Sequence, residues 1–218
     1  MGTWISRLSL RALLLGLAVA LAALPARGED ELVLVAFGDS LTAGFGLEDG
    51  DAFPTKLQKA LKSNGHKVRV VNAGVSGDTT TAGLARLDWV VPDDADAVIV
   101  ELGANDALRG LDPDQAYGAL DRIITKLRSK KLAVLLTGMQ APRNMGPEYT
   151  KEFDGIYPRL AKKHGVAFYP FFLDGVATEP KLNQSDGIHP NAEGVDVIVE
   201  RILPSVQLLL KEASGNSW

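Results

Sequence analysis

The chain of 218 residues contains no cysteine. A disulfide framework is therefore excluded, and so is catalysis by a cysteine thiolate. Stability has to come from a hydrophobic core, and a chain of this length with 46% apolar residues can build one full domain core. Histidine is also scarce, with three in the whole chain, so a reaction that needs an imidazole has few candidates.

Long apolar runs are absent as well. The uncharged run ALLLGLAVALAALP, residues 12–25, has 14 residues, whereas a membrane-spanning helix needs about 20. It follows a segment with two arginines and precedes small residues, which is typical of a signal peptide. We expect residues 1–28 to be cleaved after Gly28, with Ala22 or Ala23 as alternative cleavage sites. The mature protein is then periplasmic or secreted and has no stable membrane span; an uncleaved N-terminal anchor is the alternative.

Positive charge is in deficit in the predicted mature chain. Removing the signal peptide takes three of the 23 Lys and Arg residues and none of the 27 acidic ones, which leaves a net charge of −7. Such an acidic chain does not attract nucleic acid, so we expect no nucleic-acid partner.

Five short apolar runs rich in valine alternate with longer segments of helical period. The runs are LVLVAF, VRVVNAG, AVIVELG, LAVLLTG and VAFYPFF. Helices are expected at residues 52–64, 79–90, 113–129, 148–164 and 191–212. Runs that are apolar on both faces are typical of a parallel sheet covered by helices. The pattern predicts an α/β fold, a three-layer α/β/α sandwich, in one domain over residues 29–218.

Polar, glycine-bearing loops follow the predicted strands. The first strand runs into GDS, the second into NAGVSGDT, the third into GAND, and a late loop before the last helix reads SDGIHP. In open parallel sheets the loops at the carboxyl ends of the strands face one crevice. The sequence therefore predicts that these four loops meet at one edge of the sheet.

A serine, a histidine and an aspartate in these loops predict nucleophilic catalysis. Ser40 lies on a strand-to-helix turn, where its hydroxyl is exposed and rigidly held, but a serine needs an adjacent general base. His66 and His164 are expected on the solvated surface, which leaves His189 as the base. Asp186, three residues before His189 in a tight turn, can hold the imidazole Nδ1 and leave Nε2 facing outward.

Three groups can donate hydrogen bonds to a developing oxyanion. They are the backbone N–H of Ser40, the N–H of Gly77, which is expected where a helix begins, and the side-chain amide of Asn105. Turn geometry alone is the alternative for Gly77, and a helix cap or Asx-turn is the alternative for Asn105. Asp39 and Asp106 are interpreted as structural ligands of the loops.

The motifs GDSL, SGDT, GAND and DGIHP, in this order and spacing, resemble the blocks of the SGNH (GDSL) hydrolase family. GLARL, VELGAND, FDGIYPRLAKKHGV and DGIHPN are similar to its branch of periplasmic acyl-CoA thioesterase I, protease I and lysophospholipase L1 enzymes, the TesA-like arylesterases. The resemblance implies a five-stranded parallel sheet in flavodoxin-like order, with no metal and no cofactor. It also implies a nucleophile at Ser40, a base at His189 with Asp186 as its partner, and an oxyanion hole of Ser40, Gly77 and Asn105.

The implied activity is that of an exported serine hydrolase, which cleaves small-molecule acyl esters and thioesters through an acyl-enzyme on Ser40. A carbohydrate O-deacetylase of the same family is the first alternative, because the catalytic motifs do not determine the acyl group. A non-catalytic binding or export module is another alternative. A metal-dependent phosphoesterase is a further one, and its ligands would be Asp39, Asn105, Asp106, Asp186 and His189.

Overall fold

The computed structural model describes residues 31–215, and the predicted signal peptide lies outside the described residues. Five parallel strands form one sheet in the order β2-β1-β3-β4-β5. The strands are β1 (Leu32–Gly38), β2 (Val68–Gly74), β3 (Ala97–Glu101), β4 (Ala133–Thr137) and β5 (Ala167–Tyr169). This is the flavodoxin-like order, so the predicted sheet is confirmed.

The apolar runs lie where the sheet is covered on both faces. All residues of β3 and β4 are buried, and so are all of β1 except the first, whereas the edge strands β2 and β5 are partly exposed. In the strand register, Gly38 at the end of β1 pairs with Gly74 of β2 and with Glu101 of β3. The carboxyl ends of three neighbouring strands therefore finish at the same level.

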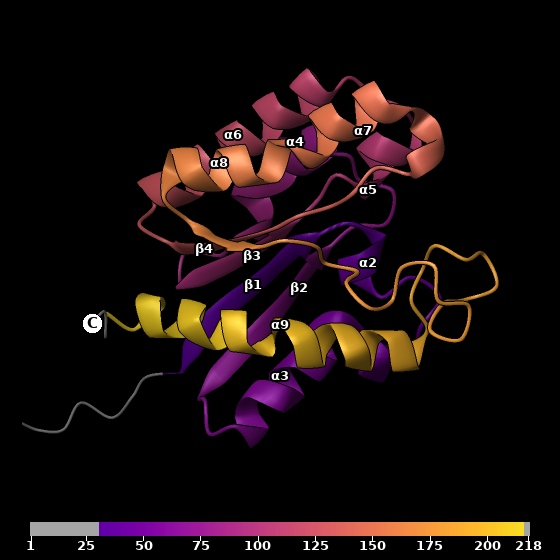
Figure 1. Cartoon of the computed structure of the whole chain (residues 1–218). Helices are drawn as coiled ribbons and strands as arrows, with labels where there is room; N and C mark the ends of the chain where they lie inside the picture. The colour runs from indigo at the N-terminus through magenta and orange to yellow at the C-terminus, as the bar shows by residue number, and fades with distance from the viewer. Residues whose placement is uncertain (1–30, 216–218) are drawn as a thin grey trace, which may run out of the picture. The chain divides into compact units, whose positions relative to one another are not determined.

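Helices cover both faces of the sheet, as the sandwich prediction requires (Figure 1). The longer ones are α3 (Phe53–Ser63), α4 (Thr80–Val90), α6 (Pro113–Ser129), α7 (Pro147–Asp154), α8 (Ile156–His164) and α9 (Ala192–Ala213). The short ones are α2 (Ser40–Ala43), α5 (Ala104–Leu108), η1 (Asp49–Asp51) and η2 (Arg143–Met145). Helices α3 and α9 pack together on one face, and α4, α6 and α8 cover the other.

The prediction of one helix over residues 148–164 was wrong. The segment consists of two helices, α7 and α8, which meet at Gly155. Pro158 lies in the first turn of α8 and has no N–H to donate to the carbonyl of Asp154, so a single continuous helix would lose that hydrogen bond. The four other predicted helices lie within one residue of α3, α4, α6 and α9 at each end.

Within residues 31–215, no helix is long and apolar enough to cross a membrane.

Candidate active site

Ser40 begins the first turn after β1. Asp39 caps the four-residue helix α2 by accepting a hydrogen bond from Leu41 N (3.0 Å), and Gly44 ends it in the left-handed region with φ of 85°. The N–H of Ser40, at the first position of this helix, is one of the amides that a helix leaves without an intrahelical acceptor. Ser40 is 9% exposed, and its Oγ lies 2.9 Å from His189 Nε2.

His189 is held in orientation by Asp186. Its Nδ1 lies 2.6 Å from Asp186 Oδ2, and the other carboxylate oxygen accepts the backbone N–H groups of Ile188 and His189, both at 3.0 Å. The hydrogen bond from His189, followed by these two amides, lowers the pKa of Asp186 to about 2. An ionised carboxylate on Nδ1–H leaves Nε2 able to accept the proton of Ser40.

The loop that carries His189 is attached to the turn that carries Ser40. Gln184 Nε2 donates to the carbonyl oxygens of Phe45 (2.7 Å) and Pro190 (3.0 Å), and Gln184 N donates to His189 O (2.8 Å). The ring of Phe45 lies on that of His189, with 4.6 Å between centroids. Two segments at least 139 residues apart in the sequence are therefore linked beside the reacting atoms.

Gly77 lies in the turn after β2, and its predicted position at a helix start was wrong. Helix α4 begins at Thr80 and is capped by Thr79, so Gly77 precedes the cap by two residues. Its φ of 87° lies in the left-handed region that favours glycine. Arg109 holds this turn from outside, with Nη2 donating to Gly77 O at 2.9 Å.

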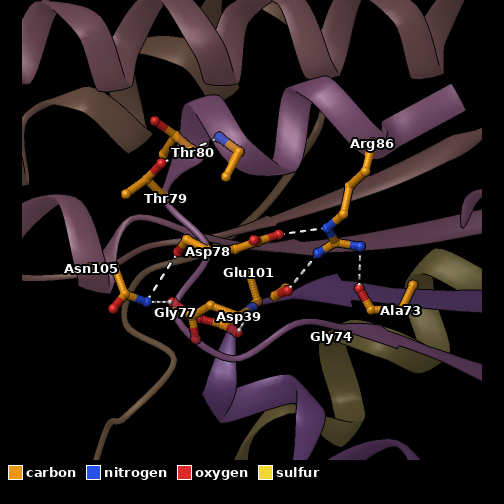
Figure 2. Close-up of polar contacts among 12 residues, drawn as sticks. Asp39, Ala73, Gly74, Gly77, Asp78, Thr79, Thr80, Arg86, Glu101 and Asn105 are labelled. Atoms are coloured by element: carbon orange, nitrogen blue, oxygen red, sulfur yellow. Dashed lines mark hydrogen bonds and ion pairs between the residues drawn. The ribbon is translucent and has the colours of Figure 1, made fainter. Parts of the chain in front are cut away.

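Asn105, the second residue of α5, directs its side-chain amide toward the same turn (Figure 2). Its Nδ2 donates to Asp78 O (3.0 Å) and to Asp39 Oδ2 (3.2 Å). The alternative of a helix cap was wrong, because Gly103 occupies the cap position of α5 and makes no side-chain cap bond. Asn105 therefore links the nucleophile turn to the Gly77 turn.

Asp39 and Asp106 have the structural contacts that the sequence interpretation gave them. Asp39 is fully buried, and desolvation raises its pKa to about 6 although hydrogen bonds from Leu41 and Asn105 oppose the shift. Asp106 accepts from the N–H (2.9 Å) and the hydroxyl (2.7 Å) of Thr80, and burial raises its pKa also. Each carboxylate fixes the start of a helix next to the site.

The other two histidines lie outside this constellation. His66 N closes the turn after α3 by donating to Leu61 O (3.1 Å). The prediction that His164 is a solvated surface residue was wrong: its side chain is 14% exposed and its Nε2 lies 2.6 Å from Asp121 Oδ1. Of the three histidines, His189 is the one bonded to Ser40.

The residues of the alternative metal interpretation do not form one cluster. Asp186 pairs with His189, Asp39 with Asn105, and Asp106 binds the start of α4. Over the part of the chain that the structure describes, no group of three or more Asp, Glu, His or Cys side chains is arranged to hold a metal ion.

Two ionisable residues beneath the site, one buried and one partly buried, were missed by the sequence analysis. Glu101 ends β3 and is fully buried, and Arg86 of α4 donates to Asp78 Oδ2 (2.5 Å), Ala73 O (2.9 Å) and Gly38 O (2.9 Å). A signal existed for Glu101, since an acid within the apolar run AVIVELG is unusual for a buried strand. Arg86 is the arginine of the segment GLARL, which resembles the family branch, but that resemblance gave this arginine no role.

A small pocket with mainly apolar walls lies beside Ser40 and His189. Its other lining residues are Leu41, Gly44, Phe45, Leu47, Pro190 and Val195. Phe45, one of these lining residues, is 49% exposed, although large apolar side chains are usually buried.

The family model described as the GDSL-like Lipase/Acylhydrolase family matches residues 36–197, a span that includes Ser40, Gly77, Asn105 and His189. The chain belongs to this family. The predicted SGNH (GDSL) relationship is thereby confirmed.

Individual relatives agree with this assignment. Esterase TesA of Pseudomonas aeruginosa is 40% identical over 202 residues, which cover 92% of this chain and all of that protein. Thioesterase 1/protease 1/lysophospholipase L1 of Escherichia coli K12 is 38% identical over 182 residues, which cover 83% of this chain and 86% of that protein. The predicted branch of the family is therefore confirmed.

Solved structures support the fold. The crystal structure of AlinE4, an SGNH-hydrolase family esterase, is 49% identical with a TM-score of 0.70 and covers 83% of this chain and 97% of its own. The crystal structure of TesA is 39% identical with a TM-score of 0.78 and covers 81% of this chain and 99% of its own.

Proposed function

We propose that this protein is an ester hydrolase that cleaves acyl esters and thioesters through an acyl-enzyme on Ser40. The observation that carries the proposal is the continuous chain from Ser40 Oγ through both imidazole nitrogens of His189 to Asp186, with separations of 2.9 and 2.6 Å. Similar proteins named esterase, arylesterase, thioesterase and lysophospholipase support the same reaction class.

In the acylation step, Ser40 Oγ attacks the carbonyl carbon of the substrate while His189 Nε2 takes the hydroxyl proton. Asp186 keeps the Nδ1 proton in place and stabilises the imidazolium that forms. The tetrahedral intermediate then collapses, and its carbon–oxygen or carbon–sulfur bond to the leaving group breaks. The leaving alkoxide or thiolate takes the proton from His189 Nε2, and the acyl group remains on Ser40.

In the second half of the reaction, water hydrolyses the acyl-enzyme. His189 removes a proton from the water, the hydroxide adds to the acyl carbon, and the intermediate releases the carboxylic acid as Ser40 Oγ regains the proton. The negative oxygen of both intermediates is stabilised by donors fixed before the reaction begins. These donors are the N–H groups of Ser40 and Gly77 and the amide of Asn105.

The pocket beside Ser40 is small and mainly apolar, and we propose that it receives the part of the acyl chain next to the carbonyl group. Leu41, Phe45 and Leu47 give it an apolar wall, and burial of apolar surface contributes roughly 25 cal/mol per Å². We expect activity to increase with acyl length until the pocket is filled. A panel of p-nitrophenyl esters of increasing length measures this, and activity restricted to acetate would favour the O-deacetylase alternative.

The mechanism is tested by labelling with a fluorophosphonate, which forms a covalent bond to an activated serine. The wild-type protein should be labelled at Ser40 equally with and without EDTA, and Ser40→Ala should not be labelled. His189→Ala should label far more slowly because proton removal fails. Labelling that EDTA abolishes would favour the metal-dependent alternative, and absence of labelling in the folded wild-type protein would overturn the proposal.

We also propose that residues 1–28 are a cleaved signal peptide and that the enzyme acts outside the cytoplasm. The basic and then apolar N-terminal pattern supports this. N-terminal sequencing of the protein from cell fractions tests it, and the expected first residue is Glu29. An intact Met1 in the membrane fraction would contradict it.

A further inference from the structure

Glu101 places a carboxyl group directly beneath the turn that carries Ser40. It is the last residue of β3 and is fully buried. Its Oε2 accepts hydrogen bonds from the hydroxyl of Thr42 (2.8 Å) and from Asp39 N (3.3 Å). These two donors lie on either side of Ser40 in the sequence, so one carboxyl group holds both ends of the turn.

The glycine at the end of β1 creates the space for this carboxyl group. A Cβ at Gly38 would lie 2.5 Å from Glu101 Oε2 and 2.1 Å from Thr42 Oγ1, closer than real Cβ atoms approach. The backbone of Gly38 does not require glycine, because its φ is not among the positive values. The first residue of the GDSL motif is therefore needed here for space, and Glu101 and Thr42 occupy that space.

No cation neutralises Glu101 within the described part of the chain. The guanidinium of Arg86 is engaged with Asp78 and with the carbonyl oxygens of Gly38 and Ala73, and Glu101 Oε1 has no hydrogen-bond partner. Isolated buried carboxylates are very costly, and such groups are protonated instead. Burial, with the neighbouring charge of Asp39, holds the pKa of Glu101 well above its usual value.

We propose that Glu101 is a positioning residue of the proposed hydrolase, whose uncharged carboxyl group fixes the Ser40 turn by binding both Asp39 N–H and the Thr42 hydroxyl. Glu101 does not touch the substrate, and this role rests on the proposed function of Ser40. The titratable groups that interact with it are Asp39, from the Ser40 turn, and Tyr157 of α8, which is buried and donates to Leu102 O. Neither is a cation at any pH, so ionisation of Glu101 would put uncompensated negative charge beneath the turn.

Three variants separate charge, hydrogen bonding and packing. Glu101→Gln keeps the shape and an acceptor oxygen without charge, Glu101→Ala removes the acceptor, and Thr42→Val removes one of its two donors. Hydrogen exchange of the peptide that covers the Ser40 turn reports on order without any need for activity. Fluorophosphonate labelling and ester hydrolysis then report on the reactivity of Ser40.

We expect Glu101→Ala to exchange faster in this peptide and to lose about 10- to 100-fold in kcat, because small displacements of reacting groups have effects of this size. KM should change little. Glu101→Gln should remain close to the wild type in both measurements, and Thr42→Val should lie between the two. If Glu101→Ala does not fold, Glu101→Gln and Thr42→Val decide the question by the same measurements.

The charge state of Glu101 can be measured separately, through the pH dependence of the free energy of unfolding. A raised pKa in the folded state means that the wild type loses stability as pH rises above 4.5, the ordinary value for this group, until the raised pKa is passed. Glu101→Gln lacks this loss, so its stability relative to the wild type should increase between pH 5 and pH 8.

Wild-type labelling at Ser40 tests the proposed function by itself, whereas the comparison among variants tests Glu101. The inference is overturned if Glu101→Ala shows wild-type exchange and wild-type labelling, or if Glu101→Gln is as impaired as Glu101→Ala. A stability difference that stays constant from pH 5 to pH 8 would also overturn it, since Glu101 would then be charged in the fold.

Discussion

Replacement of Asn105 by alanine separates its proposed oxyanion role from its structural one. The two amide hydrogens of Asn105 are both used in the resting structure, by Asp78 O at 3.0 Å and Asp39 Oδ2 at 3.2 Å. An intramolecular hydrogen bond contributes about 1 kcal/mol, and one to a charged group about 1.5 to 3 kcal/mol. Asn105→Ala should therefore lower the free energy of unfolding by about 2.5 to 4 kcal/mol.

The kinetic effect should be larger than this loss of stability can explain. Loss of one oxyanion donor lowers the rate by about 100- to 1,000-fold. A domain of ordinary stability has about 5 to 15 kcal/mol, so the variant remains predominantly folded. The rate per folded molecule should therefore fall by the full oxyanion factor. To serve the oxyanion, Asn105 has to share or release one hydrogen, and the longer bond to Asp39 is the one we expect to weaken.

Urea unfolding and the single-turnover release of p-nitrophenol measure the two effects on the same samples. Thr150→Val is a control, because the single hydroxyl hydrogen of buried Thr150 in α7 is shared between two carbonyl oxygens, those of Gly146 and Pro147. It should lose stability and keep its acylation rate. Asn105→Asp should be at least as inactive as the alanine variant, because its carboxylate faces that of Asp39. Near-normal acylation by Asn105→Ala would refute the oxyanion assignment.

Three further predictions concern the other residues of the site. His189→Ala should lose nearly all acyl transfer in ester hydrolysis assays. His164→Ala should keep acyl transfer and lose about 1.5 to 3 kcal/mol of stability from its hydrogen bond with the Asp121 carboxylate; equal loss of activity would refute the choice of base. Gly77→Ala should slow acylation and lower the melting temperature, because alanine is strained at φ of 87°; an unchanged melting temperature would contradict this. The depressed pKa of Asp186 means that its contribution to stability is present above pH 3.8 and is lost as pH falls through about 2. Acid titration should show this loss in the wild type and not in Asp186→Asn.

The fold could be predicted because its strands carry a clear signal. The runs of β1, β3 and β4 are apolar on both faces, as central parallel strands must be, and the intervening segments have helical period. The break between α7 and α8 was missed because hydrophobic period continues through Gly155. The break has a local cause: Pro158 has no N–H to donate, so one backbone hydrogen bond is missing.

The candidate site was predictable to the extent that residues close in sequence form it. Asp186 and His189 are three residues apart in one turn, and Ser40 follows the end of a buried strand. The contacts of Asn105 with Asp39, and of Glu101 with the Ser40 turn, join residues 59 to 66 positions apart. Spacing along the chain carries no information on such pairs, so these contacts emerge from the register of β1 and β3.

Asp39 and Glu101 both hold the Ser40 turn by hydrogen bonds, but they differ in charge because their surroundings differ. Asp39 receives hydrogen bonds from Leu41 N and Asn105, which favour its charged form, and its pKa of about 6 leaves it ionised at neutral pH. Glu101 is fully buried, has one oxygen without a partner and faces the charge of Asp39, so it stays protonated. The side chain of Asp39, which binds Asn105, therefore carries a negative charge, whereas the side chain of Glu101 at the end of β3 is neutral. Two carboxylates at this distance from each other would repel, whereas one carboxylate and one neutral acid can both accept hydrogen bonds from the same turn.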